Sequence, residues 1–264
     1  MNENKFIKSD ELRSQIKEVM RKNYKIIREI YKYYSAVEPC DRVFSISNNV
    51  ILDILNKCEL IDLTNLKISD VSIEFIATNT ASPGEKKTDL NPDRFITRPE
   101  FLELIVRMAL RKYKKVEGVS PVQAVELFVD QIVKYFEPFD CHIWRSTYLW
   151  NEGCDLVLKK YFPAIKLLFA KYSGRYTLPG NPKFVSLDEF IELIVASNFV
   201  DDKFGNREIS ILFNLSMMTS VEELDKERHL NMMKDEFIEA LSRIAFRVNA
   251  KSPYEVIYHL ERGN

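Results

Sequence analysis

The sequence predicts an all-α fold. Glycine is scarce, with 7 residues in 264, and 29% of the residues are charged, a composition that favours helices over a turn-rich β fold. Apolar residues recur at the spacing i, i+3, i+4 and i+7, which places them on one face of a helix, and no segment shows the sustained alternation of a half-buried strand. A length of 264 residues with 46% hydrophobic content is enough for one or two domains with a sizeable core.

An internal repeat predicts the domain organisation. Segment 24–35 aligns with segment 162–173, so that Ile27, Ile30, Tyr31 and Tyr34 match Ile165, Leu168, Phe169 and Tyr172, and we expect all eight to be buried. Four further pairs align in the same order: 51–62 with 190–201, 71–75 with 209–213, 100–110 with 236–246, and 120–128 with 252–260. The chain is therefore expected to hold a first module at 1–136, a connector at 137–154 and a second module at 155–264.

Each module is expected to contain two helix–loop–helix pairs and then an extra helix. The extra helices begin at Ser120-Pro121 and Ser252-Pro253. Serine at the N-cap with proline at the first helical position is a typical helix start.

The loops inside the pairs share a short motif. A hydrophobic residue, three spacers, glutamate and phenylalanine occur in ITRPEF (96–101), VSLDEF (185–190) and MMKDEF (232–237). The first loop, ISNNVI (46–51), keeps the hydrophobic residue but has Val50 in place of glutamate. This motif resembles that of EF-hands, and the resemblance implies that the hydrophobic residues of partner loops pair. The chain thus resembles two tandem EF-hand pairs, over 15–128 and 155–260.

One loop carries a set of oxygen ligands at the spacing of a calcium site. In DLNPDRFITRPE (89–100) these weak metal candidates are Asp89, Asn91, Asp93 and Glu100. Arg94 stands where glycine normally makes the sharp turn, at a cost of about 1–2 kcal/mol for a left-handed backbone. Residues 79–88 also separate the loop from its incoming helix. We therefore expect an ion-free loop and no cofactor, with calcium as the alternative.

A narrower resemblance concerns residues 213–245. Their long methionine-rich loop and the exit helix EFIEALSRIA resemble a calmodulin-like module of cilia- and flagella-associated proteins, particularly those of protists. Such modules occur in tandem in proteins that line or decorate axonemal microtubules, including microtubule inner proteins. The resemblance implies a structural protein of the axonemal cytoskeleton, with tubulin or neighbouring axonemal proteins as partners.

Two groups of residues are candidates for binding such partners. Aromatic side chains, which dominate interface hot spots, occur in the connector at Trp144, Tyr148 and Trp150. Basic side chains that suit an acidic tubulin surface end a helix at Arg111, Lys112 and Lys115. The alternatives are that the aromatic residues pack the two modules together and that the cations favour the negative end of the helix dipole.

Several functional classes lack their sequence signatures. No nucleophile motif or glycine-rich phosphate loop occurs, so we expect neither an enzyme nor a small-molecule substrate. The net charge of −1 lacks the excess of positive charge that is typical of proteins that bind nucleic acid. No run approaches the ~18 apolar residues of a membrane span. Four cysteines without a C-x-x-C pair, and no signal peptide, favour a reducing intracellular location. Two alternatives to the axonemal hypothesis remain: a calcium sensor or buffer that uses the 89–100 loop, and an accessory subunit of another large assembly.

Overall fold

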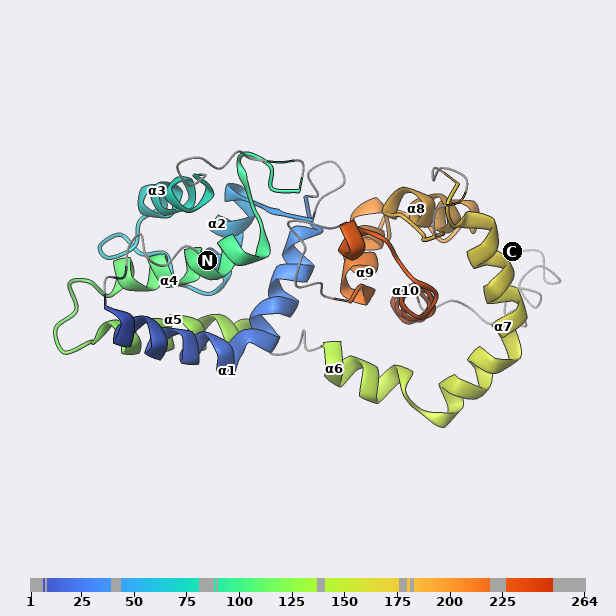
Figure 1. Ribbon diagram of the computed structural model, residues 1–264, viewed down its shortest axis with the longest axis horizontal. Helices are drawn as coiled ribbons and strands as arrows, with labels where there is room; N and C mark the ends of the chain where they lie inside the picture. The colour runs from blue at the N-terminus through green and yellow to red at the C-terminus, as the bar shows by residue number, and fades with distance from the viewer. Residues whose placement is uncertain are drawn as a thin grey trace. The chain divides into compact units, whose positions relative to one another are not determined.

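A computed structural model describes residues 7, 9–38, 44–80, 88, 90–136, 141–175, 180, 183–218 and 227–248. Across these residues the chain is mostly helical, as the sequence predicts (Figure 1). Strand pairing among them is limited to one two-stranded sheet and three isolated bridges. The chain divides into two compact units: Met1–Arg145 with Val221–Glu227, and Ser146–Ser220 with Arg228–Asn264.

The first unit contains a loop-linked set of helices and a small sheet. Its elements are α1 (Asp10–Ser35), β1 (Ile46–Ser47), α2 (Asn48–Lys57), α3 (Ile68–Asn79), β2 (Phe95–Ile96), α4 (Arg98–Lys112), α5 (Pro121–Phe136) and α6 (Cys141–Trp144). A short π-helix, η3 (Arg145–Leu149), follows α6. Helix α5 packs against both α1 and α4, and α3 packs against α2 and α4.

The second unit repeats this order of elements. It contains α7 (Glu152–Tyr172), α8 (Leu187–Ala196), α9 (Asn206–Ser216), the 3₁₀-helix η4 (Glu227–Leu230) and α10 (Lys234–Val248). Helices α7 to α10 occupy the places in the repeat of α1 to α4. The predicted extra helix of this module, at 252–260, lies outside the described residues. Helix α7 begins inside the predicted 137–154 connector, because the side chain of Asn151 accepts the Cys154 amide at 2.9 Å and caps it.

Matched helix ends show the repeat at the level of single residues. Helices α2 and α8 are each followed by a residue with a left-handed backbone, Glu59 at φ 54° and Asn198 at φ 56°. In the following linkers, the carboxylates of Asp62 and Asp201 accept backbone amides from the residues just after them. The same local turn chemistry therefore ends the second helix and starts the third in both units.

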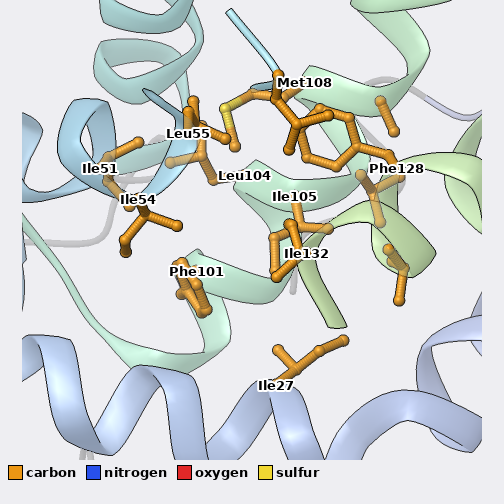
Figure 2. Packing of buried hydrophobic residues seen from close by; sticks show 14 of the residues in the cluster. Ile27, Ile51, Ile54, Leu55, Phe101, Leu104, Ile105, Met108, Phe128 and Ile132 are labelled. Atoms are coloured by element: carbon orange, nitrogen blue, oxygen red, sulfur yellow. The ribbon is translucent and has the colours of Figure 1, made fainter. Parts of the chain in front are cut away.

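The core of the first unit lies between α1, α4 and α5 (Figure 2). The predicted burial of Ile27, Ile30, Tyr31 and Tyr34 is confirmed, with each side chain at most 6% exposed. The Tyr31 ring centroid lies 5.7 Å from that of Phe101, and its hydroxyl donates to the Phe44 carbonyl at 2.8 Å. Figure 2 shows Ile27 of α1 on the same side of the core as Phe101.

The core of the second unit is built around three phenylalanines. The Phe190 ring lies 5.6 Å from Phe213 and 6.1 Å from Phe237 between centroids, and all three side chains are fully buried. On α7, Ile165 and Tyr172 are buried as predicted. The prediction was wrong for Leu168 and Phe169, which are only half-buried. In the first unit α5 covers α1, whereas the counterpart of α5 falls outside the described part of the chain.

The left-handed residue after α2 gives a stability prediction. We expect the free energy of unfolding of Glu59→Gly, measured by urea unfolding, to exceed that of Glu59→Ala by about 1 kcal/mol. The reason is that only glycine relieves the steric cost of φ 54°. Both variants lose the same side chain beyond Cβ, so alanine is the matched control. Equal stability of the two variants would show that this turn stores no backbone strain.

Candidate functional site

The paired loops are the features that the two units share most closely. In the first unit Ile46 of β1 pairs with Ile96 of β2 in antiparallel register. In the second unit Val185 and Met232 exchange two backbone hydrogen bonds, each of 3.0 Å. These are the residues that the sequence predicted to pair. Each pairing places the two loops of a unit side by side, just before the exit helices α2 and α4 or α8 and α10.

Three of these loops end in a glutamate, and we call Glu100, Glu189 and Glu236 the loop glutamates. Glu189 is 2% exposed. Its Oε2 accepts the Ser186 amide at 2.8 Å and the Ser186 hydroxyl at 3.0 Å, at the start of α8. Its Oε1 accepts the Arg175 amide at 2.6 Å, just past the end of α7. One carboxylate therefore ties the end of the incoming helix to the start of the exit helix.

Glu236 makes the same kind of connection in the partner loop. It is 3% exposed, and its Oε2 accepts the Met233 amide at 2.7 Å before α10. Its Oε1 accepts the Met218 amide, just past the end of α9, at 2.7 Å, and the Arg228 guanidinium at 3.0 Å. Both oxygens of this buried carboxylate are thus engaged by protein donors, which satisfies its charge without an ion.

Glu100 caps its exit helix in the same way. Its Oε2 accepts the Thr97 amide at 2.9 Å and the Thr97 hydroxyl at 3.1 Å, in a capping box at the start of α4. Asn79, the last residue of α3, also connects the incoming helix to this loop. The Asn79 side chain accepts the Arg94 amide at 3.1 Å and donates to the Phe95 carbonyl.

The structure describes the predicted calcium loop from residue 90 to residue 100. Arg94 has φ 66°, so the sixth loop position does adopt the left-handed turn that the sequence analysis assumed. The Asn91 amide donates to the Thr88 carbonyl at 2.9 Å, and Asp93 is exposed. Asp89 lies outside the described residues. Within the described ranges, no group of three or more His, Cys, Asp or Glu residues is placed to hold a metal ion.

The basic candidates at the end of α4 divide into two kinds. Arg111 forms ion pairs with Asp70 at 2.6 Å and Glu74 at 2.9 Å, both on α3. Lys112 donates to the Asp62 carboxylate and to the Leu60 carbonyl, at 2.7 Å in each case. Hydrogen bonding by Lys112 and by backbone amides also holds the pKa of Asp62 well below its usual range, against the effect of burial. Lys115 is exposed. The structure thus ties two of the three cations to acidic side chains of their own unit.

The aromatic candidates of the connector lie in α6, in η3 and just after it. Trp144 is half-buried, whereas the side chains of Tyr148 and Trp150 are 50% and 60% exposed. The Tyr148 ring centroid lies 4.6 Å from that of Phe246, near the end of α10. Trp150 therefore presents more of its surface than the other two aromatic residues.

A buried charged cluster on α1 was missed by the sequence analysis. Lys32 and Glu29 are 8% and 2% exposed, and Cys141 of α6 is also buried. Burial lowers the pKa of Lys32 to about 8, although the Glu29 carboxylate opposes this shift. Burial raises the pKa of Glu29, but Lys32, Cys141 and Arg28 outweigh it, so this carboxyl titrates below its usual range. Both residues occur in a run of charged and aromatic residues, and no local pattern marks which charges are buried.

Comparisons with protein-family models, with curated proteins and with solved structures found no match to this chain. No helix within the described residues combines the length and the apolar character that crossing a membrane requires.

The Glu189 contacts predict an ion-independent loss of stability. We expect Glu189→Gln to lower the free energy of unfolding by about 1–3 kcal/mol. Glutamine replaces one of the two buried carboxylate oxygens with an NH₂ group, which cannot accept a hydrogen bond from a backbone amide. The loss should be the same in calcium and in a chelator. Glu192→Gln is the matched control on the same helix. It breaks an exposed ion pair with Arg175, which predicts a loss of less than about 1 kcal/mol. A Glu189→Gln loss that appears only in calcium would identify Glu189 as a metal ligand.

For the 89–100 loop we expect calcium binding with a Kd of about 10⁻⁴ M or weaker, because two handicaps of about 1–2 kcal/mol each act on a site of the sensor class. The handicaps are the separation of the loop from α3 and the engagement of Glu100 with Thr97. Calorimetric titration of the full chain measures this affinity. A micromolar isotherm that disappears in Glu100→Gln would contradict the prediction.

The buried lysine predicts a pH effect on stability. Between about pH 8 and 10.5 the unfolded state holds the Lys32 proton and the folded state has lost it, so this group makes stability rise with pH in that window. We therefore expect the stability of the wild type relative to Lys32→Met to increase from pH 7.5 to pH 10 in urea unfolding. Lys17→Met, which removes an exposed charge from α1, controls for charge removal alone. A difference that falls with rising pH would contradict the assigned direction.

Proposed function

We propose that this chain is a non-catalytic structural protein whose two units are EF-hand-like pairs that hold their shape without an ion. The observation that carries the proposal is the use of the loop glutamates. In a working EF-hand the glutamate at the twelfth position binds calcium with both oxygens. In Glu189 and Glu236 both oxygens instead accept protein donors. The loops are thus closed by hydrogen bonds where calcium would close them.

The paired loops support the same assignment. The hydrophobic residues that pair across each unit sit four positions before the loop glutamate, and phenylalanine follows that glutamate into the core. This combination gives the motif a structural role in all three loops that does not require an ion. Burial of Phe101, Phe190 and Phe237 stabilises the helix pairs whether or not an ion is present.

We further propose a location in the ciliary axoneme, with tubulin or neighbouring axonemal proteins as partners. This part rests on the resemblance of residues 213–245 to modules of axonemal proteins. The exposed candidates for the contact are Trp150 and Lys115, since Arg111 and Lys112 are already paired within their unit. Neither an enzymatic activity, nor a nucleic acid, nor a membrane is part of this proposal.

A calcium sensor or buffer is the second candidate function. It is favoured by the left-handed turn at Arg94, which is the backbone conformation that a calcium loop needs at its sixth position. It is disfavoured by the engagement of Glu100 with Thr97. An accessory role in a different large assembly shares the ion-free architecture and differs only in the partner.

Co-sedimentation with microtubules tests the proposal. We expect the full chain to pellet with microtubules equally in calcium and in a chelator, and Lys115→Glu to weaken binding about fivefold, since a single ion pair contributes about 1 kcal/mol. Lys203→Glu, at an exposed lysine of the second unit, is the charge-matched control.

Two results would count against the proposal. Selective release from microtubules or from native axonemes by calcium or by a chelator would support the sensor instead. A tagged chain that localises away from cilia, together with no pelleting, would favour the accessory role in another assembly.

A further inference from the structure

We propose that residues 252–260 pack as a helix onto α7 and α10, as α5 packs onto α1 and α4. This inference does not depend on the axonemal assignment. It rests on a comparison of the two units, position by position, within one chain.

Helix α7 has an apolar stripe that is more exposed than the matched positions of α1, where Val19 and Ile30 are buried and Asn23 and Ile26 are half-buried. Val19 of α1 is 5% exposed, and its repeat partner Val157 of α7 is 55% exposed. The stripe runs from Val157 through Tyr161 and Ala164 to Leu168, at the spacing i, i+4, i+7 and i+11, which is one helix face. Its first three members are exposed and Leu168 is half-buried. Thus α7 carries the sequence of a covered helix.

Helix α10 shows the same change at the matched positions. Ile105 and Ala109 of α4 are fully buried, and Figure 2 shows Ile105 next to Ile132 of α5. Their repeat partners on α10 are Leu241, which is half-buried, and Ala245, which is exposed. Both helices of the second unit therefore lose burial at places where the first unit is covered by one extra helix.

The chain carries a segment with the pattern of that helix. Residues 252–260, SPYEVIYHL, align with 120–128, SPVQAVELF. In this alignment Val256, Ile257 and Leu260 match Ala124, Val125 and Phe128, which are all buried in the first unit. His259 matches Leu127, which is exposed. The apolar residues of the segment thus fall on the face that α5 turns to its own core.

The linker before the segment is long enough for this arrangement. Residues 113–120 join α4 to α5, and residues 249–252 join α10 to Pro253. Helix–helix connections in bundles commonly have 2–8 residues, so both are ordinary connections. Because the segment is tethered to α10, its effective concentration at the exposed face of α7 and α10 is high. A helix from another molecule would have to compete with that concentration.

Hydrogen exchange on the full chain tests this packing. We expect amides of α7 in residues 155–165 to exchange about tenfold faster in Ile257→Asp than in the wild type, because the variant places a charge in the proposed contact and opens that region. His259→Asp, on the opposite face, should exchange like the wild type. Exchange in α8 and α9 should not change in either variant, which would show that the rest of the second unit is intact.

A reciprocal variant keeps the test independent of the segment itself. Val157→Asp should accelerate exchange in residues 252–260, whereas Lys166→Asp on an exposed position of α7 should not. Two outcomes would overturn the proposal. One is equal exchange of α7 in the wild type and in Ile257→Asp. The other is α7 protection that grows with protein concentration, which would assign the face to a second copy of the chain.

Discussion

The connection between the loop glutamates and the backbone amides around them is the interaction on which each unit depends. A loop between two helices leaves unsatisfied amides at the start of the exit helix, and further donors past the end of the incoming one. A calcium ion would organise such a loop by gathering oxygens. Here Glu189 and Glu236 do the reverse, since one carboxylate gathers amides from both ends of the loop. The following phenylalanine then enters the core, so loop closure and core packing are fixed by adjacent residues.

This mode of closure gives the loop motif a structural role that needs no calcium ligand. The carboxylate caps a helix in Glu100, Glu189 and Glu236 alike. In the second loop the Asn79 side chain also connects the end of α3 to the loop, through the Arg94 amide and the Phe95 carbonyl. The 89–100 loop remains the one to test for calcium, because it carries oxygen side chains at Asp89, Asn91 and Asp93 as well as Glu100.

The two units differ more in what covers them than in how they are built. Ion pairs between α3 and α4 hold Arg111 in the first unit, and α5 closes its core. A charge that could attract a partner is thereby used for internal structure, whereas Lys115 and Trp150 are exposed. In the second unit the matched helices show apolar surface at Val157 and Ala245. The internal repeat reveals that difference, because Val157 and Ala245 match Val19 and Ala109, which are buried.

The sequence by itself determined the features that depend on neighbours along the chain. Helical periodicity and the Ser-Pro start of α5 follow from local steric and hydrogen-bonding rules. The pairing of Ile46 with Ile96 was expected from the resemblance of the loop motif to that of EF-hands. The sequence also predicted the burial of Ile27 and Tyr31, because the spacing of apolar residues identifies the inward face of a helix.

Only the tertiary structure decided features that depend on distant segments. The basic run at the end of α4 gave no sign that Arg111 and Lys112 would meet Asp70, Glu74 and Asp62, which approach from α3 and the linker before it. Periodicity likewise placed Leu168 on an inward face without showing what would cover it. The physical reason is the same in both cases: the pattern of a helix fixes which way a side chain points, and the neighbouring elements fix what it meets there.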